Sequence, residues 1–169
     1  MNTLETILTR RSIRKYTDKK VSDDMLEIIL KSGMYAPSAV NKQPWHFIIF
    51  RNKTIAEGLK KVHPNSVMLK QASAGILICY DELLQHDEGF GVVDCSAATQ
   101  NMLLAAHYLG LGACWIGIHP REVRKKFLQN FLKLPKHVIP FAIISIGYPD
   151  EQKHFPERFR EDRIHYEKW

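Results

Sequence analysis

Apolar residues recur along the 169-residue chain with two different periods, and each period predicts one type of secondary structure. Leu4, Ile7 and Leu8 have the spacing of one face of a helix. Ser22 is a typical helix N-cap, and Pro37 ends the apolar pattern that follows it. We expect helices over residues 3–10, 23–36, 54–62 and 92–109 and after Pro120, and strands over residues 45–50, 74–80, 113–116 and 138–146.

Two of these elements are apolar over almost their whole length. Residues 74–80 form a nearly continuous apolar run, which is typical of an interior strand of a sheet. Residues 92–109 are apolar on most sides, rich in alanine and followed by Gly110, so we expect a core helix there. Helices and strands that alternate in this way predict a single α+β domain over residues 1–169.

Residues 150–169 form a polar extension after the last predicted strand, with many closely spaced charges. This composition favours a solvated tail. The extension ends, however, in Tyr166 and Trp169, and terminal aromatic side chains usually pack against something. Composition alone leaves both interpretations open.

The overall composition is that of one globular domain, with 45% hydrophobic and 25% charged residues. At this length folding removes roughly 70% of the unfolded surface from water, so the core needs no disulfide and no structural metal. The chain has 24 Lys and Arg against 18 Asp and Glu, a net charge of +6, which favours an anionic partner. A nucleic acid, a phosphorylated cofactor and an acidic membrane surface all satisfy this charge.

The cysteines indicate a reducing compartment and no metal cluster. Cys79, Cys95 and Cys114 each lie in an apolar stretch, with no second cysteine two or three residues away. Buried free thiols and the lack of an apolar signal-peptide core in the first eleven residues predict a cytoplasmic protein. Since no window approaches 18 uninterrupted apolar residues, we expect no membrane-spanning segment.

A cationic segment, Arg10-Arg11-Ser12-Ile13-Arg14-Lys15, follows the first predicted helix. If this segment is extended, Arg10, Ser12 and Arg14 project to one side. Two planar guanidinium groups and a hydroxyl suit a phosphate, because they donate paired, charge-assisted hydrogen bonds. The spacing equally fits a cationic helix C-terminus that complements the helix dipole. Nucleic-acid binding is a further alternative, although no basic face with interleaved aromatic residues follows.

A second candidate is the loop A-P-S-A-V-N-K-Q-P-W at residues 36–45. Two prolines stiffen it, so it can present backbone N–H groups, the Ser38 hydroxyl and the carboxamides of Asn41 and Gln43 to a ligand. Ordinary turn chemistry explains the same composition. The glycines at residues 110–117 allow a flat ligand to approach the backbone, or simply serve turns.

Signals for side-chain catalysis are missing from the sequence. The eight histidines are scattered, and there is no H-E-x-x-H, no G-x-S-x-G, no G-x-G-x-x-G fingerprint and no P-loop. We therefore expect no catalytic side chain and no bound metal, and we expect the chemistry to belong to a cofactor.

Taken together, four motifs resemble the nitroreductase family of flavin-dependent oxidoreductases. They are R-R-S-I-R-K-Y, A-P-S-A-V-N-K-Q-P-W-H-F, G-L-G-A-C-W-I-G and I-G-Y-P, and they follow one another over essentially the whole chain. The resemblance implies an α+β fold with a mixed, mainly antiparallel central sheet flanked by helices. It also implies an intertwined homodimer with one FMN per subunit in the interface.

The resemblance assigns FMN contacts to four groups of residues. They are Arg10, Arg11, Ser12 and Arg14 at the phosphate and ribityl chain; Pro37, Ser38, Ala39, Asn41 and Gln43 in a loop that reaches the flavin of the other subunit; Trp115, Ile116 and Gly117 against the isoalloxazine; and Arg158 and Arg160 completing the phosphate site. Residues 150–169 would then pack on the other subunit. Ala39 stands where the family often has a second serine, so only backbone contact carries over at that position.

The implied reaction passes a hydride from NADH or NADPH to FMN and then electrons to a nitroaromatic or quinone-like acceptor, with ping-pong kinetics. The alternative is a flavin-binding protein for storage, sensing or handling of flavin without nitroreductase turnover. Either function takes small molecules as ligands and needs neither nucleic acid nor membrane. The chain is short for the family, so we expect an open substrate pocket.

Overall fold

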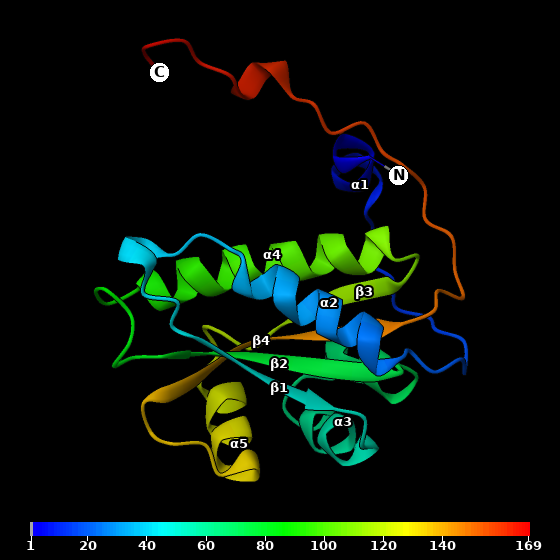
Figure 1. The fold of residues 1–169 in the computed structure, drawn as a ribbon, viewed down its shortest axis with the longest axis vertical. Helices are drawn as coiled ribbons and strands as arrows, with labels where there is room; N and C mark the ends of the chain where they lie inside the picture. Colours follow the sequence, from blue (N-terminus) through cyan, green and yellow to red (C-terminus); the bar gives the residue numbers. More distant parts are fainter. Residues whose placement is uncertain (1) are drawn as a thin grey trace.

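The computed structural model, which describes residues 2–169, has helices on both faces of a four-stranded sheet (Figure 1). The helices are α1 (Thr3–Thr9), α2 (Asp23–Met34), α3 (Lys53–Lys60), α4 (Phe90–Tyr108) and α5 (Glu122–Leu132). The strands are β1 (Trp45–Phe50), β2 (Ala74–Asp81), β3 (Gly112–Gly117) and β4 (Val138–Gly147). Short 3-10 helices cover Ala39–Asn41 (η1), Pro64–Lys70 (η2) and Glu161–Arg163 (η3). The predicted α+β class is confirmed.

The strands follow the order β1-β2-β4-β3, and each neighbouring pair is antiparallel. All eight residues of β2 are buried between β1 and β4, which confirms the predicted interior strand. Within the described residues, the parallel part of the expected mixed sheet is one bridge between Ser12 and Ala113. At this bridge the cationic segment joins the edge strand β3.

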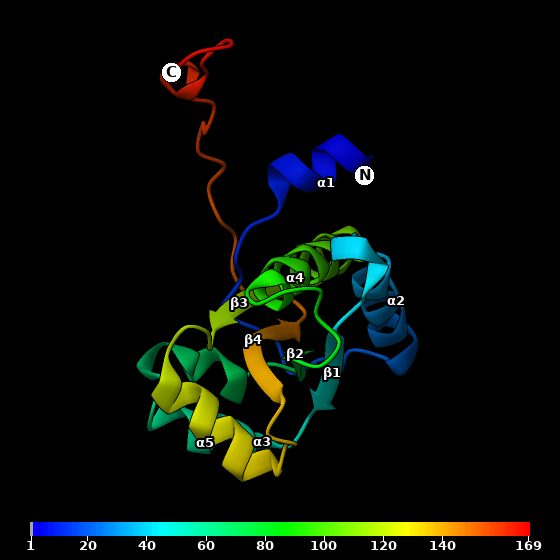
Figure 2. The same ribbon diagram turned by 90° about the vertical axis from the view of Figure 1, so that its left-hand side faces the viewer.

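Two hydrophobic cores lie on opposite faces of the sheet. The helices α2 and α4 cover one face, and α3 and α5 cover the other (Figures 1 and 2). Successive side chains of β2 alternate between the cores: Ile76 and Ile78 pack with α2 and α4, whereas Leu77 and Cys79 pack with α3 and α5. Buried residues along α4 include Cys95 in the first core, so the predicted core helix is confirmed.

Helix boundaries differ from the expected ones by one or two residues, for local reasons. α1 ends at Thr9 rather than Arg10, because Arg10 has non-helical backbone angles of φ −56° and ψ 132°. α4 begins at Phe90 rather than at residue 92, because the chain turns at Gly89, whose positive φ of 92° suits glycine. Ser22 caps α2 as predicted, since its side chain accepts a hydrogen bond from the Met25 amide.

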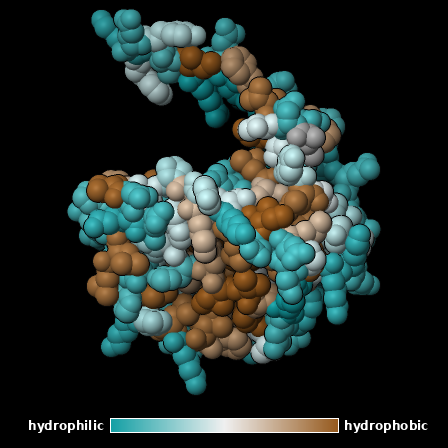
Figure 3. Space-filling model, viewed as in Figure 1, coloured by the Kyte–Doolittle hydropathy of each residue, from teal (hydrophilic) through white to brown (hydrophobic). Residues whose placement is uncertain are grey.

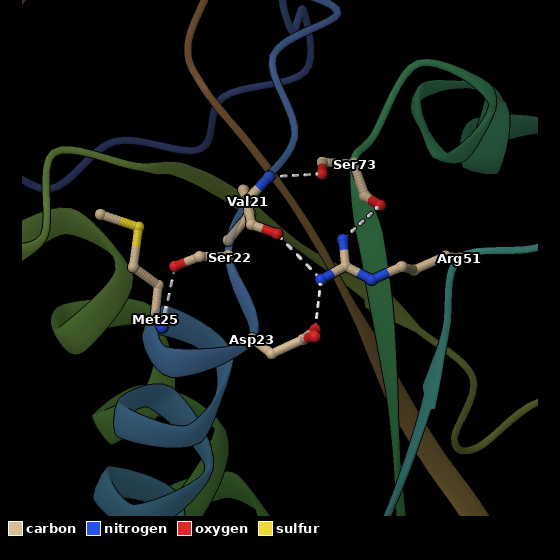
Figure 4. Close-up of polar contacts among 6 residues, drawn as sticks. All are labelled: Val21, Ser22, Asp23, Met25, Arg51 and Ser73. Carbon is tan, nitrogen blue, oxygen red and sulfur yellow. Dashed lines mark hydrogen bonds and ion pairs between the residues drawn. The ribbon is translucent and has the colours of Figure 1, made fainter.

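Arg51 connects the end of β1 to the turn before α2 (Figure 4). Its Nη2 donates to the Val21 carbonyl oxygen and to the Asp23 carboxylate, both at 2.8 Å. The Ser73 hydroxyl accepts from the Val21 amide at 2.8 Å, just before β2. The charged side chain of Arg51 therefore stabilises the fold by joining these segments.

Residues 152–169 leave the body of the molecule and extend beyond α1 (Figures 1 and 2). All side chains of this tail are exposed, including those of Phe155, Phe159 and Trp169. Figure 3 shows apolar side chains of the tail standing clear of the body. In the single chain the tail thus leaves its aromatic residues largely open to solvent.

Candidate active site

The cationic segment after α1 runs in an extended conformation along the edge of the sheet. The Ile13 amide donates to the Ala113 carbonyl oxygen at 3.0 Å, next to the bridge that Ser12 forms with Ala113. Successive side chains of an extended chain point to opposite sides. This extended conformation is the one in which the sequence predicts that Arg10, Ser12 and Arg14 project to one side.

The Cys114 thiol on β3 lies near Arg10, Ser12 and Arg14 of this segment. Burial raises the pKa of Cys114, whereas Arg14, Ser12 and Arg10 are near enough to oppose that rise. All three residues therefore lie near one buried thiol on β3.

A cleft of about 470 Å³ lies between the cationic segment and the tail. It is lined by Arg11, Ser12, Arg14, Lys153, His154, Pro156 and Arg158. Four of these residues are cationic and none is acidic. Glu151 lies nearby, but its carboxylate accepts from the Arg14 amide at 2.6 Å and pairs with Lys153 at 2.6 Å. The lining therefore favours an anion that accepts several hydrogen bonds, such as a phosphate.

Arg10 and Arg158 come together from opposite ends of the chain. Burial lowers the pKa of Arg10, and the guanidinium groups of Arg158 and Arg11 lower it further. Like charges held close together repel one another, so an anion between them stabilises the cluster. The cluster is therefore preorganised for a multiply charged anion.

Two predicted phosphate ligands have protein partners in this structure. The Arg11 guanidinium donates to the carbonyl oxygens of Leu8 at 2.9 Å and His154 at 3.1 Å, and it stacks on the Phe155 ring. Arg11 thus fastens the tail to α1, although it also lines the cleft. Arg160 forms paired hydrogen bonds of 2.9 and 2.8 Å with Asp162 and is not among the described residues lining the cleft.

The loop at residues 36–44 lies at the other end of α4 (Figures 1 and 2). The Ala39 amide donates to Asp94 Oδ1 at 3.0 Å, near the start of α4, whereas Thr9 Oγ1 lies 2.8 Å from His107 Nε2, near its end. Asp94 and His107 are 13 positions apart on the helix, which places these two contacts roughly 20 Å from each other. The structure therefore does not bring Pro37, Ser38, Ala39, Asn41 and Gln43 to the cationic cleft of the same chain.

The predicted ring-binding segment is the end of β3. Trp115 is half-buried, and its ring meets Phe141 edge-on with centroids 5.6 Å apart. The Ile116 side chain is buried in the core beside α3 and α5, so Ile116 offers only its backbone to a ligand. The Gly117 carbonyl oxygen accepts a hydrogen bond of 2.8 Å from Arg124 Nη1, which fixes the end of the strand.

Sequence reasoning missed several residues at these places. Lys153 and His154 line the cleft but belong to a stretch that composition assigned to the polar tail. Arg124 contacts the end of β3 from α5, a helix in which the sequence singled out no functional residue. Asp94 carried one signal, an acidic residue in an otherwise apolar helix.

The structure gives no indication of a metal centre or a membrane span in residues 2–169. No group of three His, Cys, Asp or Glu side chains in this part of the chain is placed to hold a metal ion. None of its helices combines the length and apolarity that crossing a membrane requires.

Comparison with known proteins identifies the family. A profile of the nitroreductase family matches residues 7–83 and 63–148. A protein of Methanothermobacter thermautotrophicus, provisionally named an NADH dehydrogenase/NAD(P)H nitroreductase, is 48% identical over 169 residues, which are 100% of this chain and 88% of the relative. A protein of Archaeoglobus fulgidus with the same provisional name is 47% identical over 170 residues, covering 98% of both chains. The chain belongs to the nitroreductase family.

Solved structures of relatives share the fold. A Parabacteroides distasonis protein, again provisionally named an NADH dehydrogenase/NAD(P)H nitroreductase, has a TM-score of 0.94 at 36% identity and covers 100% of both chains. A provisionally named nitroreductase from Desulfovibrio desulfuricans, solved in complex with FMN, has a TM-score of 0.89 at 33% identity, covering 100% of this chain and 99% of its own. The predicted nitroreductase-like fold is confirmed.

Proposed function

We propose that this chain is an FMN-dependent oxidoreductase that passes a hydride from NADH or NADPH through bound FMN to a nitroaromatic or quinone-like acceptor. The observation that carries the proposal is the cationic cleft of about 470 Å³, whose lining suits the FMN phosphate. FMN in the D. desulfuricans structure supports the cofactor, and the names of the relatives support NAD(P)H as electron donor.

The chemistry of the cleft residues fits a phosphate. Arg14 and Arg158 supply guanidinium groups, Ser12 a hydroxyl and Lys153 an ammonium group, all of which donate hydrogen bonds to phosphate oxygens. Arg10, crowded by Arg158, gains from the same anion. Arg11 contributes charge while it holds the tail. A phosphate contact of Arg160 rests on the resemblance alone, since Asp162 pairs with its guanidinium and Arg160 does not line the cleft among the described residues.

When bound, FMN supplies the hydride and electron transfer that amino-acid side chains lack. The chain's own residues bind and orient it: the cleft fixes the phosphate end, and the backbone of Trp115, Ile116 and Gly117 borders the ring end. Donor and acceptor exchange electrons with the same flavin, one after the other, so we expect them to use one site in turn, with ping-pong kinetics. We also place the protein in the cytoplasm, where its three buried thiols stay reduced.

We further propose a homodimer of single-domain subunits in which residues 150–169 pack on the other subunit and each FMN lies in the interface. The separation of roughly 20 Å along α4 supports this arrangement, because the loop at residues 36–44 meets a cationic cleft only if that cleft belongs to a second chain. The exposed apolar residues Leu4 and Leu8 on α1 and Phe159 in the tail supply surface for the contact.

Anaerobic stopped-flow spectroscopy of the FMN-loaded protein tests this function. Mixing with NADH or NADPH should bleach the flavin absorbance rapidly, and subsequent mixing with a quinone should restore it. A protein that binds flavin for storage, sensing or handling keeps its absorbance on the same timescale, and that result would reject the enzymatic proposal in favour of this alternative.

A further inference from the structure

A buried carboxylate holds the loop at residues 36–44 in place. Asp94 is 3% exposed, and its Oδ1 accepts a hydrogen bond of 3.0 Å from the Ala39 amide, 55 residues earlier in the chain. Its Oδ2 is buried and has no hydrogen-bond partner among the described residues. A carboxylate accepts a stronger hydrogen bond from an amide than a neutral group does, so this contact is a firm anchor for the loop.

The anchored loop has an unfavourable backbone conformation. Val40, Asn41 and Gln43 have φ values of 49°, 54° and 49°, in the left-handed region. This region is least favourable for a β-branched residue such as Val40. Such a conformation persists only where surrounding contacts impose it, and it is common in loops that bind ligands.

The other hydrogen bonds of residues 37–43 close the loop on itself, and the last residue of the loop, Pro44, is bonded to β2. The Ser38 hydroxyl accepts from the Gln43 amide at 3.0 Å, and the Ser38 carbonyl oxygen accepts from the Asn41 amide at 3.0 Å. At the end of the loop, the Pro44 carbonyl oxygen accepts from the Asp81 amide at 2.8 Å. Between Ala36 and Pro44, the contact with Asp94 is thus the side-chain hydrogen bond that connects the loop to a core helix.

The loop leaves its functional groups free. Asn41 and Gln43 are exposed, and no hydrogen bond within the described residues involves either carboxamide. A rigid backbone that displays unpaired polar groups is preorganised, and preorganisation lowers the entropic cost of binding.

We propose that Asp94 is a positioning residue for flavin binding: its hydrogen bond to the Ala39 amide holds the loop in the conformation that presents the Asn41 and Gln43 carboxamides to FMN. This inference rests on the proposed function, in which the loop faces the flavin bound by the other subunit. Asp94 itself is buried beneath the loop and acts on the flavin only through it.

Three variants of the full-length protein test the proposal. Asp94→Ala removes the anchor, and Asp94→Asn keeps a neutral acceptor of the same shape. Thr99→Val is the matched control, because Thr99 is fully buried on the same helix and its hydroxyl donates to the Cys95 carbonyl oxygen at 2.6 Å, away from the loop. Two quantities are measured for each: hydrogen exchange of the Ala39 amide in flavin-free protein, and the Kd for FMN.

We expect Asp94→Ala to exchange the Ala39 amide roughly tenfold faster and to raise the Kd for FMN by a similar factor. For Asp94→Asn, both the exchange rate of the Ala39 amide and the Kd for FMN should stay within about threefold of the wild-type values. Thr99→Val should leave both unchanged. If Asp94→Ala does not fold, Asp94→Asn is compared with Thr99→Val. Of these two variants, only Asp94→Asn should speed the exchange of the Ala39 amide.

Wild-type exchange in both Asp94 variants would overturn the proposal, as would equal loosening of FMN by Thr99→Val. Faster exchange with unchanged FMN affinity would also overturn it, because the loop would then be anchored without helping the flavin. If even the wild type fails to bind FMN, the proposed function fails, and the exchange measurement still reports whether Asp94 anchors the loop.

Discussion

The phenol oxygen of Tyr16 lies 2.7 Å from the Ser145 hydroxyl on β4, and it donates to the Ile13 carbonyl oxygen at 2.6 Å. This pair ties the end of the cationic segment to the sheet. The Tyr16 ring lies against Gly147, where a Cβ would come within 2.8 Å of the ring. The position of the phosphate-binding segment thus depends on a buried phenol and on a glycine that makes room for it.

Tyr16→Phe should make the protein less sensitive to alkali. Burial raises the pKa of Tyr16, so above about pH 10 the unfolded chain loses this proton while the folded chain keeps it. Folding stability therefore falls as pH rises through that range, and Tyr16→Phe removes this share of the loss. At neutral pH the variant should lose about 1–2 kcal/mol with its hydrogen bonds.

Urea unfolding of both proteins at neutral pH and above about pH 10 measures this difference. The buried thiols add to the alkaline loss in both, since burial raises the pKa of Cys79 to about 12. The wild type and the variant differ only at Tyr16, so their difference isolates the phenol. Equal loss of stability in the two proteins would show that the phenol does not ionise on unfolding.

Arg158→Ala should weaken the binding of FMN but not of riboflavin. The side chain lines the cationic cleft, and a charge-assisted hydrogen bond to phosphate is worth about 1.5–3 kcal/mol, or roughly tenfold to a hundredfold in Kd. Riboflavin lacks the phosphate and therefore reports any general damage to the site. Titration of flavin fluorescence gives both constants.

Arg160→Ala is the control for that experiment. Its guanidinium is already bound by Asp162, so we expect a change in the FMN Kd of less than about threefold. A larger loss with Arg160→Ala than with Arg158→Ala would mean that the tail binds the phosphate in another arrangement.

His63→Leu should make the protein less sensitive to acid. The imidazole is 5% exposed, and neither ring nitrogen has a hydrogen-bond partner among the described residues. Burial and the Arg124 charge lower the pKa of His63. Below about pH 6.5 the unfolded chain therefore takes up a proton that the folded chain resists, and stability is lost as pH falls.

Thermal unfolding at neutral pH and near pH 5 tests this prediction. Between neutral pH and about pH 5, the His63→Leu variant should lose less folding stability than the wild type. At neutral pH the stabilities of the two proteins should agree within about 1 kcal/mol. Burial also lowers the pKa of His107 and of His119, so part of the acid loss persists in the variant. An unchanged loss would contradict the role given to His63.

The double change Leu4→Glu and Leu8→Glu should convert a dimer into a monomer. Both side chains are about 70% exposed on one face of α1, and the added charges oppose burial of that face in an interface. Light scattering should fall from twice the chain mass of 19.6 kDa to that mass, with loss of FMN binding. Val123→Glu, on the exposed side of α5, is the control that should change neither.

Local pattern predicted the elements because burial and chain geometry act over short distances. The continuous apolar run of β2 and the alanine-rich α4 follow directly from how each is buried. The spacing of Arg10, Ser12 and Arg14 predicted their shared side because an extended chain alternates its side chains. These features depend on neighbouring residues alone.

The pattern of apolar and polar residues did not predict contacts between segments that are distant in the sequence. Nothing near Asp94 in the sequence indicates that its carboxylate meets the Ala39 amide, and nothing near Arg124 indicates the Gly117 carbonyl oxygen. The placement of the residue 36–44 loop and the cationic segment at opposite ends of α4 also arises only from the folded chain. The sequence identified the groups of residues, and the structure showed that one chain keeps them apart.

The visible absorbance spectrum of the protein, taken after incubation with FMN and removal of free flavin by gel filtration, tests the central claim most directly. The cationic cleft predicts a flavin band that elutes with the protein in stoichiometric amount. A colourless protein after the same treatment would contradict FMN binding, and with it the proposed oxidoreductase.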